Sequence, residues 1–210
     1  MILPLESDPD WLTRVGAAVD VVVLVAINSQ AYGMRPVPLA AHGWFAANLA
    51  EARKRIEPSR LVLAIGAGGM DWISGNIRPS SVSFPEAARL SGYHRTPITF
   101  DSDALNSRLA FNDARGRRHL VWLLDAASAY NQLVEASRSG LKNIALQSPG
   151  MVDAGFWELL GSGSAERRDP SAANLVSLGN YVGFEGDGAL LKVTATAKDG
   201  HRTFTVDHST

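Results

Sequence analysis

The sequence contains no cysteine. This absence excludes disulfides, thiolate metal sites and cysteine nucleophiles, and it leaves the cellular compartment open because either redox environment tolerates such a chain. An excess of one charge is missing as well, since 20 basic residues are mixed with 21 acidic ones and the formal net charge is -1. The chain therefore lacks a general electrostatic footprint for polyanions, and we expect no nucleic-acid partner.

Long apolar runs are also absent. The longest uninterrupted one, Val21–Ile27, is far too short to cross a bilayer. The N-terminal residues MILPLESDPDWL carry acids where a signal peptide needs basic residues. We therefore expect no membrane span and no signal peptide in this chain. Its localisation stays unassigned, and it would be extracytoplasmic if the chain derives from a larger fusion.

Several motifs that bind cofactors or metals are missing. There is no phosphate-binding G-x-x-x-x-G-K-[ST] loop and no G-x-S-x-G serine elbow, and no two of the five histidines stand at ligand spacing. The glycines of Gly66–Gly69 lack the third glycine of a dinucleotide fingerprint. We expect no cofactor and no metal.

What the chain does have is a repeated order of strand, loop and helix. Its 210 residues are 46% hydrophobic, enough to bury a sizeable core. Apolar runs predict strands, and capping residues and helical spacing predict helices between them. The strands are expected at Ile2–Leu5, Val19–Ala26, Arg60–Ala67 and Lys142–Gln147, and the helices at Pro9–Ala18 (capped by Asp8) and Trp44–Ile56. This order predicts a parallel βα architecture with right-handed crossovers.

The pattern loosens over Gly68–Arg118, which we interpret as an insertion beside a site. Within it, the sequence indicates a short helix and two strand-like pieces, at Phe84–Ser91, Pro97–Phe100 and Leu109–Asn112. A strand at His119–Leu124 follows, and then a helix that is capped by Asp125 and ended by Gly140.

Beyond an expected helix at Asp153–Leu160, the composition changes. Residues 161–180 are typical of a linker, and short alternating segments at 181–184, 189–196 and 202–206, separated by glycines, predict antiparallel hairpins. The predicted organisation is thus a main unit over 1–160 with an insertion at about 68–125, a linker over 161–180 and a hairpin extension over 181–210.

Five segments in this order carry a family resemblance: DVVVLVAIN, PVPLAAHGWF, RLVLAIGAGGMDW, VWLLDAASAYNQ and NIALQ. The order resembles the last strands of glycoside hydrolase family 18 (GH18) barrels. It is closest to the GH18-like domain of bacterial proteins that fuse it to a polysaccharide deacetylase and a family 2 glycosyltransferase. The resemblance implies an α/β fold: a partial (β/α)8 TIM barrel, strands five to eight, with an α+β insertion and a small C-terminal antiparallel β extension.

The resemblance also shows what this chain has lost. GH18 hydrolysis depends on a Glu that ends a D-x-x-D-x-D-x-E motif, and no such motif occurs here. The Tyr-Asp pair of strand six stands as Ile27-Asn28, and the Trp that closes the sugar subsite stands as Gln147. We therefore expect no catalytic residue and a degenerate domain, a pseudoenzyme, that binds or positions an N-acetylglucosamine-type polysaccharide.

The same resemblance supplies candidate carbohydrate-binding residues. These are Asn28, Asp71, Trp72, Asp101, Trp122, Asp125 and Gln147. Structural interpretations stand beside them. Asp125 precedes a predicted helix, where an N-cap is the commoner role, and Asp71 and Trp72 are equally consistent with a turn and a sealed barrel mouth. His119 is better explained as the first residue of a strand than as a base, and Asn131 and Gln132 are expected on helix faces.

Two further functional hypotheses remain. The chain is alternatively the C-terminal part of an active glycoside hydrolase whose acid lies on upstream sequence. It is alternatively a protein-interaction module, because four strands of a barrel leave two open edges that favour pairing with a second copy or with a companion chain that completes the barrel.

Overall fold

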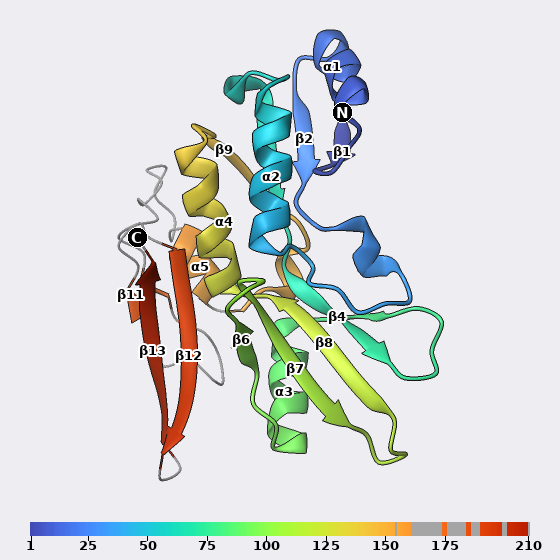
Figure 1. Ribbon diagram of the computed structural model, residues 1–210, viewed down its shortest axis with the longest axis vertical. Coiled ribbons are helices and arrows are strands. Elements are labelled where there is room, and N and C mark those ends of the chain that lie inside the picture. The colour runs from blue at the N-terminus through green and yellow to red at the C-terminus, as the bar shows by residue number, and fades with distance from the viewer. Residues whose placement is uncertain (154, 161–173, 176–183, 186–189, 199–200, 210) are drawn as a thin grey trace.

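The computed structural model describes residues 1–153, 155–160, 174–175, 184–185, 190–198 and 201–209. Two sheets follow one another along its long axis (Figure 1). The first is a four-stranded sheet in the order β1-β2-β3-β9, and the second is a five-stranded sheet in the order β5-β4-β8-β7-β6. All pairings in the first sheet are parallel and all in the second are antiparallel.

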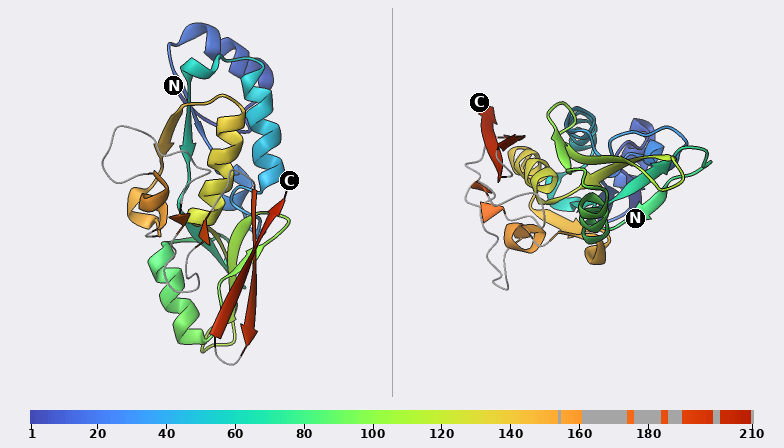
Figure 2. Two further views of the ribbon diagram at one scale, coloured as in Figure 1. Left: turned by 90° about the vertical axis from the view of Figure 1, so that its left-hand side faces the viewer. Right: turned by 90° about the horizontal axis from the view of Figure 1, so that it is seen from below.

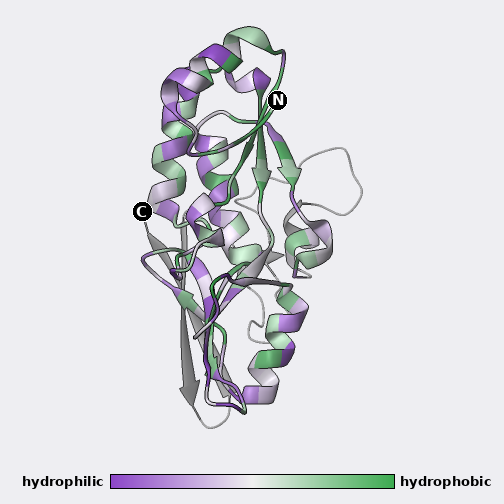
Figure 3. Ribbon diagram, turned by 90° about the vertical axis from the view of Figure 1, so that its right-hand side faces the viewer, coloured by the Kyte–Doolittle hydropathy of each residue, from purple (hydrophilic) through white to green (hydrophobic). Residues whose placement is uncertain are grey.

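The parallel sheet is the partial barrel. Its strands are β1 (Ile2–Pro4), β2 (Val22–Val25), β3 (Leu61–Ile65) and β9 (Asn143–Leu146). Their apolar character is evident in Figure 3. Side chains on alternate positions, such as Leu24 and Leu63, are fully buried against the helices and form the main core. The prediction of a parallel βα unit is confirmed, with strands shorter than the apolar runs.

Helices cover one face of this sheet. They are α1 (Pro9–Ala18), α2 (His42–Arg53), α4 (Ala126–Arg138) and α5 (Gly155–Leu160), and short 3₁₀ turns lie at Ser29–Tyr32, Pro58–Arg60 and Pro149–Met151. Helices α2 and α4 lie side by side (Figure 2). The predicted cap of α1 is present, because the Asp8 carboxylate accepts hydrogen bonds from two backbone N–H groups of the first turn, both at 3.0 Å.

The antiparallel sheet is the insertion between β3 and α4. It contains β4 (Gly68–Ile73), β5 (Ser80–Val82), β6 (Thr99–Asp101), β7 (Asn106–Asn112) and β8 (Arg118–Leu124), with helix α3 (Phe84–His94) packed on it. Gly68–Ile73, a part of the insertion in which the sequence indicated no strand, forms the strand β4 directly after β3. Gly68 makes the sharp turn between the two strands with a φ of +78°, a conformation that glycine adopts at little cost.

The two faces of the insertion sheet have different neighbours. One face, which we call the loop face, carries Met70, Trp72 and Trp122 and packs against the segment of residues 31–41 that precedes α2. The other, the helix face, packs against α3 through residues such as Val121 and Leu123. Since the side chains of a strand point alternately to its two faces, consecutive residues of β4 and of β8 contact different parts of the molecule.

The C-terminal region contains two antiparallel pairs. Strands β10 (Asn174–Leu175) and β11 (Phe184–Glu185) form one, and β12 (Leu190–Lys198) and β13 (His201–Ser209) form the other. The hairpin predicted from the segments at 189–196 and 202–206 is therefore present. Most of the predicted linker at 161–180 and most of the segment at 181–184 lie outside the described residues, and the domain boundaries stay a prediction.

Two kinds of feature are absent from the described residues. None of the helices in this part of the chain is both long enough and apolar enough to pass through a membrane. Among the same residues, no three His, Cys, Asp or Glu side chains gather closely enough to hold a metal ion.

Candidate functional site

The candidate site lies at the carboxyl ends of the parallel strands. Strand β2 leads into the segment of residues 26–41, and β3 leads directly into β4 of the insertion. Both segments therefore stand at the end of the sheet where βα barrels build their binding sites. Asn106, on β7 of the insertion, ties the segment of residues 26–41 to the insertion, because its side chain accepts a hydrogen bond from Ala40 N and donates one to Ala40 O, both at 3.1 Å.

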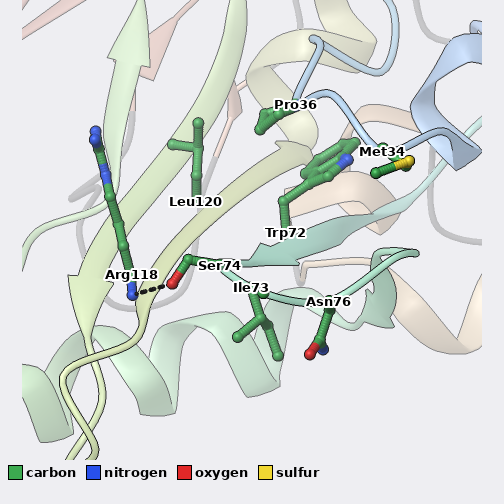
Figure 4. A pocket seen from close by; sticks show the side chains of 9 residues that line it. Met34, Pro36, Trp72, Ile73, Ser74, Asn76, Arg118 and Leu120 are labelled. Atoms are coloured by element: carbon green, nitrogen blue, oxygen red, sulfur yellow. Dashed lines mark hydrogen bonds between the residues drawn. The ribbon is translucent and has the colours of Figure 1, made fainter.

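A cavity of about 310 Å³ opens between these two segments. Its floor includes the indole of Trp72, which Figure 4 shows flanked by Met34 and Pro36. Trp72 Nε1 donates a hydrogen bond to the carbonyl of Gly33 at 3.0 Å, so the ring is fixed to the loop. We call this cavity the Trp72 pocket. Its lining residues are Met34, Pro36, Trp72, Ile73, Ser74, Gly75, Asn76, Arg118 and Leu120.

The polar part of the Trp72 pocket is made mostly of hydrogen-bond donors. Ser74 Oγ accepts a hydrogen bond from Arg118 N at 2.9 Å, which leaves the hydroxyl proton able to donate. Asn76 contributes an exposed amide. Arg118 is exposed, and no ion pair of its guanidinium is present in the part of the chain that the structure describes. No Asp or Glu is among the lining residues.

Three predicted residues share the loop face of the insertion. Trp72 lines the pocket, and Trp122 is 7% exposed and lies beneath the guanidinium of Arg108, whose carbon is 5.8 Å from the ring centroid. Asp101 forms an ion pair with the same Arg108 at 3.4 Å and also accepts hydrogen bonds from the next turn. The structure therefore brings these three residues together, but only Trp72 lines the cavity.

Asp71 lies on the opposite face from its neighbour Trp72. Its Oδ2 is 2.7 Å from His119 Nδ1, and both side chains are buried. Burial raises the pKa of Asp71, an effect that the hydrogen bond and the charge of His119 oppose. The ring of His119 also stacks on the ring of Phe111, and the two ring centroids are 4.4 Å apart. The pair thus holds β4 to β8 inside the insertion, which also explains His119 as a strand residue.

Asp125 is the N-cap of α4, as the alternative interpretation predicted. Its Oδ1 accepts a hydrogen bond from Ser128 N at 3.0 Å, its Oδ2 accepts one from the hydroxyl of Ser107, and the side chain is fully buried. The contact with Ser107 ties the insertion to α4. Asn131 and Gln132 are on α4 as expected, and both are buried there.

Asp153 is a buried acid that the sequence interpretation treated only as a helix start. Its carboxylate accepts hydrogen bonds from Ala126 N at 2.7 Å and from Phe156 N at 3.0 Å, and so joins the first turns of α4 and α5. Burial and the nearby charge of Asp125 raise the pKa of Asp153 to about 7. The position of Asp153 at the start of a predicted helix is typical of a capping residue. Nothing in the sequence indicated that Asp153 lies close to Asp125.

Three polar residues stand where parallel strands end. Asn28 Oδ1 accepts a hydrogen bond from Gln30 N at 2.9 Å. The backbone N–H of Gln147 donates to Ile65 O at 2.8 Å, while its Oε1 is buried with no hydrogen-bond partner among the described residues. Glu6, which sequence reasoning missed, follows β1 in the same way. Its Oε1 accepts from Ser29 N at 2.7 Å, and its Oε2 is likewise buried and unpaired within the described part of the chain.

The comparisons with known proteins agree with this architecture. No protein-family model matches the sequence. A chitinase from Chromobacterium violaceum superimposes with a TM-score of 0.66 and 23% identity, over 74% of this chain and 52% of its own. The spore cortex-lytic enzyme SleL of Bacillus cereus superimposes with a TM-score of 0.63 and 21% identity, over 71% of this chain and 38% of its own.

A curated relative also matches most of this chain but only about half of its own length. The protein described as uncharacterized glycosylase YvbX, from Bacillus subtilis strain 168, is 18% identical over 168 residues, which is 76% of this chain and 48% of that protein. The chain thus spans about half the length of the curated relative it matches. The closer resemblance to the deacetylase and glycosyltransferase fusions stays a prediction. The chain therefore has the fold of part of a TIM barrel of the GH18 chitinase type.

Proposed function

We propose that this chain is a GH18-like domain that binds an N-acetylglucosamine-type glycan and does not hydrolyse it by itself. The observation that carries the proposal is the Trp72 pocket. It is formed by the loop that follows β2 and by the insertion that follows β3, and it combines an apolar surface with hydrogen-bond donors. A pyranose ring has apolar C–H faces and hydroxyl edges, so it matches such a lining.

The proposed absence of hydrolysis is supported by the sequence and by the structural roles of three carboxylates. The chain has no D-x-x-D-x-D-x-E motif. Asp125 and Asp153 accept backbone hydrogen bonds at helix starts, and Asp71 is paired with His119. A glycosidase needs a carboxylic acid beside the scissile bond, and the lining of the Trp72 pocket has none.

The test measures binding and turnover on the same protein. Chitooligosaccharides are titrated into the purified chain by calorimetry, and the same mixtures are incubated and examined for shorter products. We expect binding without products, and weaker binding by Met34→Ala, which removes an exposed lining side chain. Trp11→Ala, at an exposed apolar residue of α1 that does not line the pocket, is the control. Turnover that disappears on replacing one carboxylate of this chain would refute the proposal.

A second candidate function is association with another polypeptide through the face of the parallel sheet that points away from the helices. This face carries Val23, Val25 and Val62, which are half-buried although they lie at the centre of the sheet. Ile2, on the edge strand, is 68% exposed. An apolar sheet face and two open edges favour a partner that completes the barrel.

Light scattering across a wide concentration range tests self-association. We expect a mass above that of one chain, and a fall toward one chain in Val62→Lys, which places a charge on the apolar face. Tyr93→Lys is the control, because Tyr93 is 82% exposed on α3, outside the parallel sheet. A strictly monomeric wild-type protein would remove a second copy as the occupant.

A further inference from the structure

Arg118 gives the Trp72 pocket a single charge. It is the one charged residue of the lining, and its exposed side chain follows the same face of β8 as Leu120. Figure 4 shows the guanidinium extending beside Leu120, away from the backbone contact with Ser74. The lining of the pocket therefore carries one positive charge and no negative one.

The nearest acids in the sequence are turned away or already paired. Asp113 belongs to the same turn as Arg118 but accepts a hydrogen bond from Arg117 at 2.8 Å and faces His119, on the helix face of the insertion. Asp101, on the loop face, is paired with Arg108. Among the described residues, Arg118 thus has no carboxylate partner within ion-pair distance.

We infer that the Trp72 pocket takes a sugar ring bearing a carboxylate, whose charge is met by the guanidinium of Arg118. The inference rests on the proposed glycan-binding function and narrows its ligand to acidic sugars. A guanidinium presents paired N–H donors that match a carboxylate, and hydrogen bonds between such charged groups are stronger than neutral ones. The cavity of about 310 Å³ is at the small end of ligand sites, which suits one ring. A single unpaired arginine does not provide the row of charges that a polyanion requires.

The experiment compares two disaccharides that differ by one group. The neutral probe is the disaccharide of N-acetylglucosamine, and the acidic probe replaces one of its units by N-acetylmuramic acid, which adds a lactyl carboxylate. We expect calorimetry to show the acidic probe bound roughly three- to tenfold more tightly at low salt, because the ion pair is partly exposed. Added sodium chloride should narrow the difference, since salt screens exposed charges.

Variants assign the effect to one side chain. Arg118→Gln should bind both probes with the affinity of the neutral one, and Arg118→Lys should retain part of the preference. Arg115→Gln is the matched control, because Arg115 is an exposed arginine of the same turn that does not line the pocket. Thermal melting verifies that each variant is folded.

The outcomes separate this inference from the proposal on which it rests. Equal affinity for the two probes overturns the inference and leaves glycan binding intact. A preference for the acidic probe that survives in Arg118→Gln also overturns it, because another group must then meet the carboxylate. Failure of both probes to bind refutes the proposed function, and the inference falls with it.

Discussion

Replacing Asp153 by asparagine should stabilise the protein above neutral pH and flatten the dependence of its stability on pH. The carboxyl group is fully buried and joins α4 to α5 through hydrogen bonds from Ala126 N and Phe156 N. Burial and the charge of Asp125 disfavour the ionised form and raise the pKa of Asp153 from 3.8 to about 7. Asparagine keeps an oxygen for one of these hydrogen bonds and carries no charge.

The direction of this pH dependence follows from whether the folded or the unfolded chain holds the proton of Asp153. Between about pH 4 and about pH 7, folded Asp153 keeps a proton that the unfolded chain has released, so the free energy of unfolding falls as the pH rises through this window. Each unit of pKa corresponds to about 1.36 kcal/mol, which gives roughly 4 kcal/mol across the window. The pKa of about 7 already includes the opposing effect of the backbone N–H groups that favour the charged form.

Urea unfolding of the wild type and Asp153→Asn, followed by circular dichroism from about pH 4 to about pH 8, measures the effect. We expect similar stabilities at the acidic end and a difference of up to roughly 4 kcal/mol in favour of the variant at the basic end. Asp113→Asn provides an opposite control. Burial raises the pKa of Asp113, but hydrogen bonds from Arg117 and Arg115 outweigh it and lower the pKa from 3.8 to about 2. This variant should therefore be less stable than the wild type above about pH 4, by an amount that does not change across the range. A pH-independent difference between the wild type and Asp153→Asn would refute the reasoning.

Three substitutions test the packing that positions the site, each measured by urea unfolding. Gly66→Ala should cost about 1–3 kcal/mol by overpacking, because a Cβ there would lie 2.7 Å from Ile27 Cγ1; a cost that is strictly additive with that of Ile27→Ala would contradict this contact. Asn106→Ala should cost about 1–3 kcal/mol or more, because it leaves the N–H and carbonyl of Ala40 unpaired; an unchanged midpoint would show that water replaces the side chain. Arg60→Met should cost about 1–2 kcal/mol by removing donors to carbonyls at the end of α1, and Lys54→Met, at an exposed lysine, should not.

The parts of the fold that were predictable are those decided by local chemistry. Asp8 and Asp125 cap helices because a carboxylate satisfies N–H groups of the first turn. Gly140 ends α4 with a φ of +74°, the conformation expected after a helix. The continuous apolar runs predicted strands buried in a parallel sheet, and β2 and β3 lie within those runs.

The parts that were missed depend on partners distant in the sequence. Strand β4 begins with two glycines and contains Asp71, residues that disfavour strands on their own. Its pairing with β8, where Met70 lies opposite Trp122, supplies what local preference lacks. The separation of Asp71 and Trp72 onto opposite faces follows from that pairing. The predicted site joined the two because they are adjacent in the chain.

The same pairing gives a structural role to several polar residues that the sequence placed in the candidate site. The Asp71–His119 pair holds β4 to β8, Asp125 joins α4 to the insertion through Ser107, and Asp153 joins α4 to α5. Leaving any of these buried groups without its partner costs about 1–3 kcal/mol or more, a large part of the stability of an ordinary domain. These acids therefore contribute to the packing and hydrogen bonding of the fold. Ile27 lies in contact range of Gly66 and packs against the loop face. The buried acids and Ile27 thus hold the strands, helices and insertion together, whereas other residues line the Trp72 pocket.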